Sequence, residues 1–270
     1  MSSSNSILVR ELYLFHKMER ELYMCLVFVL DRDPTQSLLV MALWMWLEQI
    51  GHRNLIAKLL SLSYNLRNAV ANEAVDCLEC LEADDEVQVQ VQPHTHYCIP
   101  LTTTLTPLTL HFFKKKRFTV LAGIKSILDN LCSRIFRDIL WHVFGRVVPP
   151  GFPHPLYGRL KARREEWDLR DERVWRWRPC DDVMEDDTTM FLTFSRGFPV
   201  SQEEVEFLFR SAFGEDSVQL HMHQQEEQIL FATLVVDSVA TVDRILNGKR
   251  IAKFRINGKH IWARKYERRD

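Results

Sequence analysis

The chain has 270 residues and a formal net charge of −1 at pH 7, with 46% hydrophobic and 26% charged residues. These values are typical of a globular protein with one or two domains, and the near-neutral charge argues against a protein that coats nucleic acid through bulk charge. Six cysteines, a polar start and no apolar run of membrane-spanning length predict a protein of the nucleus or cytoplasm with no membrane partner.

Residues 1–82 predict an α-helical bundle. Apolar residues recur at steps of three and four from Leu8 to Val29, the pattern of one amphipathic helix. Asp33 and Pro34 suit the N-cap and first turn of the next helix, and the nearly all-apolar stretch Leu38–Leu47 places that helix at the bundle centre. Its two tryptophans are expected to pack in the core rather than to bind a peptide. We expect any protein partner to bind through this helical region.

Residues 83–118 predict a linker that is partly disordered. The strand-like alternation from Val87 to Val91 is flanked by acidic residues, and Thr102–Thr109 is poor in charge and contains a proline. The basic run from Lys114 to Arg117 has two functional interpretations, a nuclear-import signal and a phosphate contact. A solvated face is the default for such a run.

Residues 119–187 predict a helix over 119–144, then a Pro-rich stop, a basic arm and an acidic hinge. The arm, Tyr157–Arg178, contains eight Lys/Arg and five Asp/Glu residues with three interleaved tryptophans. An arginine beside a tryptophan can stack on bases, and the same pair can form a cation–π contact at a domain interface. Both interpretations stay open.

Residues 188–270 predict a small sheet domain. Four segments are predicted as strands: Met190–Phe194, Val218–His223, Ile229–Val236 and His260–Tyr266. Ser201 and Glu204 form a capping box ahead of one helix, and a second helix spans Val239–Leu246. The order β-α-β-β-α-β is the ferredoxin-like arrangement. The predicted fold class is therefore α+β, with a helical N-terminal region followed by this domain.

Two segments of the domain resemble the RNA-recognition motif (RRM). Met190–Ser195 resembles the six-residue RNP motif, whose aromatic second position is Phe191. In the eight-residue RNP motif, Phe231 takes the third position and Thr233 the usually aromatic fifth, while Ile229-Leu230 replace a Lys/Arg-Gly pair. The resemblance implies a sheet that stacks single-stranded RNA bases, with one of three stacking positions lost. With the helical region ahead of it, the chain also resembles plant RRM-like proteins of uncharacterised role.

Strand alternation predicts which of these side chains share a face. The aromatic residues of the motifs point away from the helices, and an RRM-like strand order would put the strand of Trp262 beside that of Phe191. Rings there would stack bases, while basic side chains would contact phosphates. The candidate RNA-binding residues are Phe191, Thr193, Phe231, Thr233, Trp262, Arg264, Lys265, Lys259 and Arg255.

Charge is distributed unevenly along the domain. Residues 244–270 contain ten Lys/Arg against two Asp/Glu, whereas residues 188–243 contain two against nine. This asymmetry predicts a basic edge that suits a phosphate track, with a solvated face as the default interpretation.

Side chains of zinc-ligand type occur at Cys77, Cys80, His94, His96 and Cys98. Their spacing matches no common zinc finger, so structural cysteines are favoured. His221 and His223 share a strand face without a paired thiol or carboxylate. No phosphate-binding loop or catalytic motif is present, so we predict no metal, no cofactor and no catalysis.

The sequence thus yields two hypotheses from different classes. The first is a regulatory protein that binds single-stranded RNA on the sheet. The alternative is a protein-interaction or scaffold module whose sheet is occluded. Solvent exposure of Phe191 and Phe231 discriminates between them.

Overall fold

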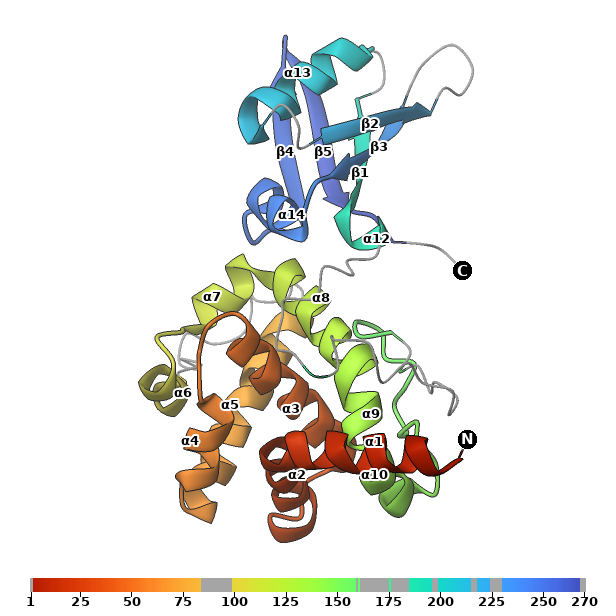
Figure 1. Cartoon of the computed structure of the whole chain (residues 1–270). Helices are drawn as coiled ribbons and strands as arrows, with labels where there is room; N and C mark the ends of the chain where they lie inside the picture. Colours follow the sequence, from red (N-terminus) through yellow and green to blue (C-terminus); the bar gives the residue numbers. More distant parts are fainter. Residues whose placement is uncertain are drawn as a thin grey trace. The chain divides into compact units, whose positions relative to one another are not determined.

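The computed structural model describes residues 2–83, 99–158, 160, 175, 185–195, 199–214, 218–223 and 230–267 (Figure 1). The protein is α+β, with a helical N-terminal region and a five-stranded antiparallel sheet near the C-terminus. It divides into two units. The helical unit contains the described residues of 2–82, 99–113 and 123–175, and the sheet unit contains residue 83, residues 114–122 and the described residues of 185–267.

The first helices follow the predicted apolar stripe with interruptions. The single predicted helix is replaced by three pieces: α1 (Ser2–Phe15), α2 (Lys17–Met24) and the π-helical η1 (Cys25–Val29). The next helix, α3 (Pro34–Gln49), begins as predicted. Asp33 Oδ1 accepts a hydrogen bond from the backbone N–H of Gln36 at 2.7 Å, which satisfies one of the unpaired donors of the first turn.

Helix α3 supplies much of the core of the helical unit. All residues from Ser37 to Leu47 are buried, including Trp44 and Trp46, which confirms core packing for both rings. Helices α4 (Leu55–Ser61) and α5 (Tyr64–Glu82) pack against it. A helix that is apolar all round thus lies at the centre of its bundle, as its composition requires.

The linker predicted over 83–118 is helical in most of its described part. Helices α6 (Pro100–Leu105) and α7 (Leu110–Lys115) lie there. Glu73 of α5 accepts hydrogen bonds from the backbone N–H groups of Leu101 at 3.0 Å and Thr102 at 2.6 Å. A carboxylate that close to a helix N-terminus stabilises it. The cap comes from another helix, so the sequence around α6 does not reveal it. The alternating stretch 87–91 lies outside the described residues.

The helix predicted over 119–144 is present as successive pieces: α8 (Arg117–Ile127), the π-helical η3 (Leu128–Cys132), α9 (Ser133–Ile135) and α10 (Arg137–Phe144). Gly145, with φ +66°, ends α10 as predicted. In α8, Gly123 lies against the indole of Trp46. A Cβ at this position would be 2.0 Å from Trp46 Nε1, so only glycine permits the approach.

The sheet contains one more strand than predicted. Its strands are β1 (Thr189–Phe194), β2 (Val218–His223), β3 (Phe231–Val236), β4 (Ile251–Ile256) and β5 (Lys259–Lys265). They pair antiparallel in the order β2-β3-β1-β5-β4. The strand of Trp262, β5, therefore lies beside that of Phe191, β1, as expected, and β4 is an additional edge strand. Asn257 and Gly258, with φ of +48° and +78°, form the tight turn between β4 and β5.

Helices α13 (Gln202–Phe213) and α14 (Val239–Leu246) cover one face of the sheet (Figure 1). Their apolar residues and alternate strand residues form one core, which includes Met190, Leu192, Val205, Phe209, Ala232, Leu234, Val242, Ile261 and Ala263. The strand residues among these are those predicted to point inward. The short helix α12 (Glu185–Thr188) precedes β1 in the predicted acidic hinge, and the rest of that hinge lies outside the described residues.

Replacing Gly123 by alanine should destabilise the helical unit by about 1–3 kcal/mol, the cost of overpacking a filled core, because Trp46 is only 4% exposed. Urea unfolding followed by far-ultraviolet circular dichroism measures this. In a Trp46→Phe background the indole nitrogen is gone, so the added methyl group should cost less. An equal cost in both backgrounds would show that the indole is not the obstacle.

Candidate nucleic-acid interface

The face of the sheet opposite α13 and α14 carries most of the predicted RNA-binding residues. Strand alternation puts inward side chains in the core and leaves Phe191 and Thr193 of β1 on the other face. By the same alternation Phe231 and Thr233 of β3 lie beside them. We call this surface, with Trp262, Arg264 and Arg255, the aromatic face.

Two phenylalanines stack at the centre of the aromatic face. The ring centroids of Phe191 and Phe231 are 5.5 Å apart with an interplanar angle of 25°. The guanidinium of Arg264 lies over the Phe191 ring, with Cζ 4.8 Å from the centroid, a cation–π contact. Both phenylalanine rings are half-buried, so each retains accessible surface. The centre of the face is thus a preformed cluster of two rings and one cation.

The strand register extends this cluster across the sheet. Phe191 pairs with Thr233 on one side and with Arg264 on the other. Thr233, the residue that the resemblance to the eight-residue RNP motif sets at a usually aromatic position, thus lies next to Phe191. Trp262 pairs with Thr193, two residues along the strands from the Phe191–Arg264 pair and on the same face. A third ring therefore lies near the stacked pair.

The additional strand β4 adds Lys253 to the aromatic face, beside the predicted Arg255. Lys253 pairs with Trp262, and Arg255 pairs with His260; all but the half-buried Trp262 are exposed. The alternating stretch 250–256, followed by an Asn-Gly turn, was the available signal for this strand. None of the five strands contains an acidic residue, so the strands contribute only basic and neutral side chains to the face.

Two of the nine predicted residues lie elsewhere. Lys259 and Lys265 share the alternation of Ile261 and Ala263, whose side chains are in the core, so both lysines lie on the helix side of the sheet. Lys265 Nζ donates to the backbone carbonyl of Asp186 in α12. The structure brings together the other seven predicted residues and separates these two from them.

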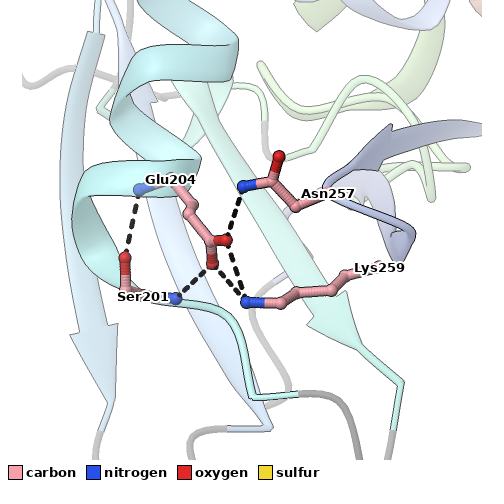
Figure 2. A network of polar contacts seen from close by, with 4 residues as sticks. All are labelled: Ser201, Glu204, Asn257 and Lys259. Carbon is pink, nitrogen blue, oxygen red and sulfur yellow. Dashed lines mark hydrogen bonds and ion pairs between the residues drawn. The ribbon is translucent and has the colours of Figure 1, made fainter.

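Lys259 belongs to a network centred on Glu204 of α13 (Figure 2). Its Nζ lies 2.9 Å from Glu204 Oε1 and 2.7 Å from Oε2. The same carboxylate accepts from Asn257 Nδ2 at 2.8 Å and from the backbone N–H of Ser201 at 3.0 Å, the latter closing the predicted capping box. Glu204 therefore joins the N-terminus of α13 to the β4–β5 hairpin.

These donors change the acidity of Glu204. The hydrogen bond from Lys259, followed by those from Asn257 and the Ser201 backbone, lowers the pKa of Glu204 to about 2. Each of them stabilises the charged form. The carboxylate is consequently ionised at every pH at which the protein is expected to function.

The histidine and cysteine candidates lie on different elements. His221 is exposed on β2, level with Thr233. Cys77 and Cys80 lie in α5, and Cys77 is buried. Over the described residues, no group of three or more potential metal ligands comes together. His94, His96, Cys98 and nearly all of the basic arm lie outside those residues; Trp175 of the arm contacts Phe15 edge-on at 5.8 Å.

Comparisons of the chain with protein-family models, with curated proteins and with solved structures found no match in any of the three. Across the described residues, every helix is too short or too polar to cross a membrane.

Glu204→Gln should destabilise the β4–β5 hairpin at neutral pH. A carboxyl group whose folded pKa lies below its ordinary 4.5 stabilises the fold above pH 4.5 and loses that effect as pH falls toward 2. The difference in stability between wild type and variant should therefore shrink between these two values. Urea unfolding followed through the amide NMR signals of Asn257 and Gly258 measures it.

The matched control is Glu206→Gln on the same helix, which removes an ion pair with Arg210 at 3.3 Å and leaves an amide oxygen that can still accept the hydrogen bond from Gln202 Nε2. That change should cost at most about 0.5 kcal/mol, the usual value of an exposed helical pair. If both variants behave alike, the Glu204 network does not hold the hairpin.

Proposed function

We propose that the sheet unit is a degenerate, RRM-like domain with a ferredoxin-like arrangement, and that its aromatic face binds single-stranded RNA. The role is regulatory, in the nucleus or cytoplasm, and involves no chemistry on the RNA. The observation that carries this proposal is the stacked pair of Phe191 and Phe231 with Arg264 over the first ring.

Stacking supports the proposal because every base has a π-face that an aromatic ring or a guanidinium plane can cover. Phe191, Phe231 and Arg264 present such planes on adjacent strands, and Trp262 lies one step further along β5. Two bases stacked on the phenylalanine pair would extend the existing stack. The face therefore fits unpaired bases better than a duplex, whose bases are already stacked.

Charge supports it as well. Exposed Lys253 and Arg255 line the β4 edge beside Trp262, in a sheet without acidic residues. Phosphates of a strand whose bases stack on the rings would pass close to these cations. Thr233 stands where a stacking aromatic residue is usual in this motif. We therefore expect a lower affinity for RNA than that of a domain with three aromatic residues.

The alternative is a protein-interaction or scaffold module in which a partner or another part of the chain occludes the aromatic face. The partial exposure of Phe191 and Phe231 is compatible with either ligand, and the stacked pair with Arg264 over it is the observation that favours RNA.

Replacing both Phe191 and Phe231 by alanine should weaken RNA binding by about 2–6 kcal/mol, at ~1–3 kcal/mol per stacked base. The fold should survive, because neither ring is part of the buried core. Fluorescence anisotropy with labelled single-stranded RNA, together with circular dichroism of the full chain, measures both quantities.

The control for this double variant is Phe207→Ala. Phe207 is 70% exposed on α13, which covers the opposite face of the sheet, so its loss should leave RNA affinity unchanged. Equal RNA affinity of wild type and the double variant would favour the alternative of an occluded sheet.

Replacing Lys253 and Arg255 by alanine should reduce the dependence of RNA affinity on salt. Each phosphate contact on a single strand contributes a slope of about −0.7 in log affinity against log salt, so the slope should become shallower by about 1.4. Two unrelated sequences should be affected alike, because phosphate contacts carry no sequence information. Lys259→Ala should leave the slope unchanged, since its ammonium is bound to Glu204.

A further inference from the structure

The end of the predicted linker and the start of the helix after it belong to the sheet unit. Residues 114–122 are grouped with it, and Phe118 packs against its hydrophobic core. Asp243 of α14 accepts hydrogen bonds from the backbone N–H groups of Phe118 and Thr119, each at 3.0 Å, and from Thr119 Oγ1 at 2.5 Å. A distant carboxylate thus caps the first turn of α8 and fixes the segment in place.

Burying the carboxylate of Asp243 at this position costs free energy. Its side chain is 4% exposed, and burial raises its pKa although the three hydrogen bonds act in the opposite direction. A buried carboxylate is tolerated where donors compensate for the lost water. The sheet unit therefore contains a buried carboxylate, that of Asp243, which holds Phe118 and Thr119 in place. The four residues before them, Lys114–Arg117, are all basic.

The hydrogen bonds to Asp243 bring the Lys114–Arg117 run against the turn between α14 and β4. A Cβ at Gly248 would lie 3.7 Å from the carbonyl oxygen of Lys114 and 3.9 Å from Cα of Lys115. Gly248 is followed by Lys249, which is exposed, as is Lys115. Two basic segments more than 100 residues apart in the sequence are thus neighbours in space.

The concentration of positive charge here is unusual for this near-neutral chain. Residues 114–122 and 239–256 contain nine Lys/Arg and one acidic residue, the buried Asp243. Like charges held close together repel one another, and a bound anion relieves that repulsion. The line of exposed cations continues from Lys115 and Lys249 into β4, whose Lys253 and Arg255 border the aromatic face.

We propose that Lys115 and Lys249 form a second phosphate-binding surface, over which an RNA strand runs after it leaves the aromatic face at β4. The proposal rests on the proposed function and adds an extension of the site along the backbone of the strand. The surface reads no bases, since it offers only cations. It lengthens the bound segment beyond the nucleotides that stack on the rings.

A nuclear-import receptor is the other partner that the basic run suggested. A receptor that reads a short basic peptide along its length needs that peptide extended and free. Here the run spans the last two residues of α7 and the first residue of α8, and the N–H groups that follow it donate hydrogen bonds to Asp243. The folded geometry therefore favours RNA, a polyanion, over an import receptor as the partner of this basic run.

The test compares two variants of the full chain, Lys115→Gln with Lys249→Gln, and Lys253→Gln with Arg255→Gln. Each is titrated by fluorescence anisotropy with labelled single-stranded RNAs of about four and about sixteen nucleotides, the range that single-strand sites cover. The β4 pair should flatten the salt slope on both lengths. The Lys115/Lys249 pair should flatten it by about 1.4 on the long RNA alone. Between ~50 and ~200 mM salt this is about a sevenfold smaller loss of affinity.

The charge-matched control is Arg53→Gln with Lys58→Gln, two exposed cations of the helical unit, which should change neither slope. An unchanged slope of the Lys115/Lys249 variant on the long RNA overturns the extension. Equal flattening on both lengths also overturns it, because the two lysines then act on the aromatic face itself. Loss of nuclear accumulation in cells with an unchanged slope would assign the run to an import receptor instead.

Failure of the proposed function is distinguishable from these results. In that case the short RNA binds equally well to wild type and to the Phe191→Ala, Phe231→Ala variant. Short-RNA binding that depends on both rings, with no effect of Lys115 and Lys249 on the long RNA, removes only the extension.

Discussion

The geometry of the candidate site depends most on the hydrogen bonds that the Glu204 carboxylate accepts. The carboxylate accepts hydrogen bonds from the start of its own helix and from both ends of the β4–β5 turn, at Asn257 and Lys259. The hairpin carries Trp262 and the basic residues of β4. A helix on one side of the sheet thus fixes the position of side chains on the other side, because a β-strand transmits register to both of its faces.

Much of the fold follows from local sequence patterns. The capping residues Asp33 and Ser201, the buried character of α3 and the alternation of β1 and β3 were readable because each signal lies within a few residues of its effect. Helix α6 was missed for the opposite reason. Its cap is Glu73, 28 residues earlier, and α8 likewise depends on Asp243, 124 and 125 residues later. Hydrogen bonds over such separations leave no trace in local composition.

In the candidate site, too, local patterns predicted some residues correctly and others wrongly. Ring placement followed from alternation, so Phe191, Phe231 and Trp262 lie where the sequence indicated. The basic residues were selected by proximity in the chain, which ignores the side of the strand. Lys259 and Lys265 consequently face the helices, whereas Lys253 lies on the aromatic face in β4, a strand that was not predicted although its Arg255 was a candidate. Applying alternation to the charged residues as well would have separated the two groups.

The discontinuous make-up of the sheet unit has a consequence for how the protein is made. Thr119 and its partner Asp243 are 124 residues apart, so at ~5–20 residues per second about 6–25 s of synthesis separate them. The central strand β1 likewise waits for β5, which pairs with it from Phe194↔Ile261 to Met190↔Lys265. Phe118 and the basic run beside it therefore emerge long before their binding site exists, while the helical unit on either side of them is being completed. Assembly of the sheet unit is a late event dominated by contacts distant in sequence, the kind that slows folding and leaves apolar surface open to chaperones in the interval.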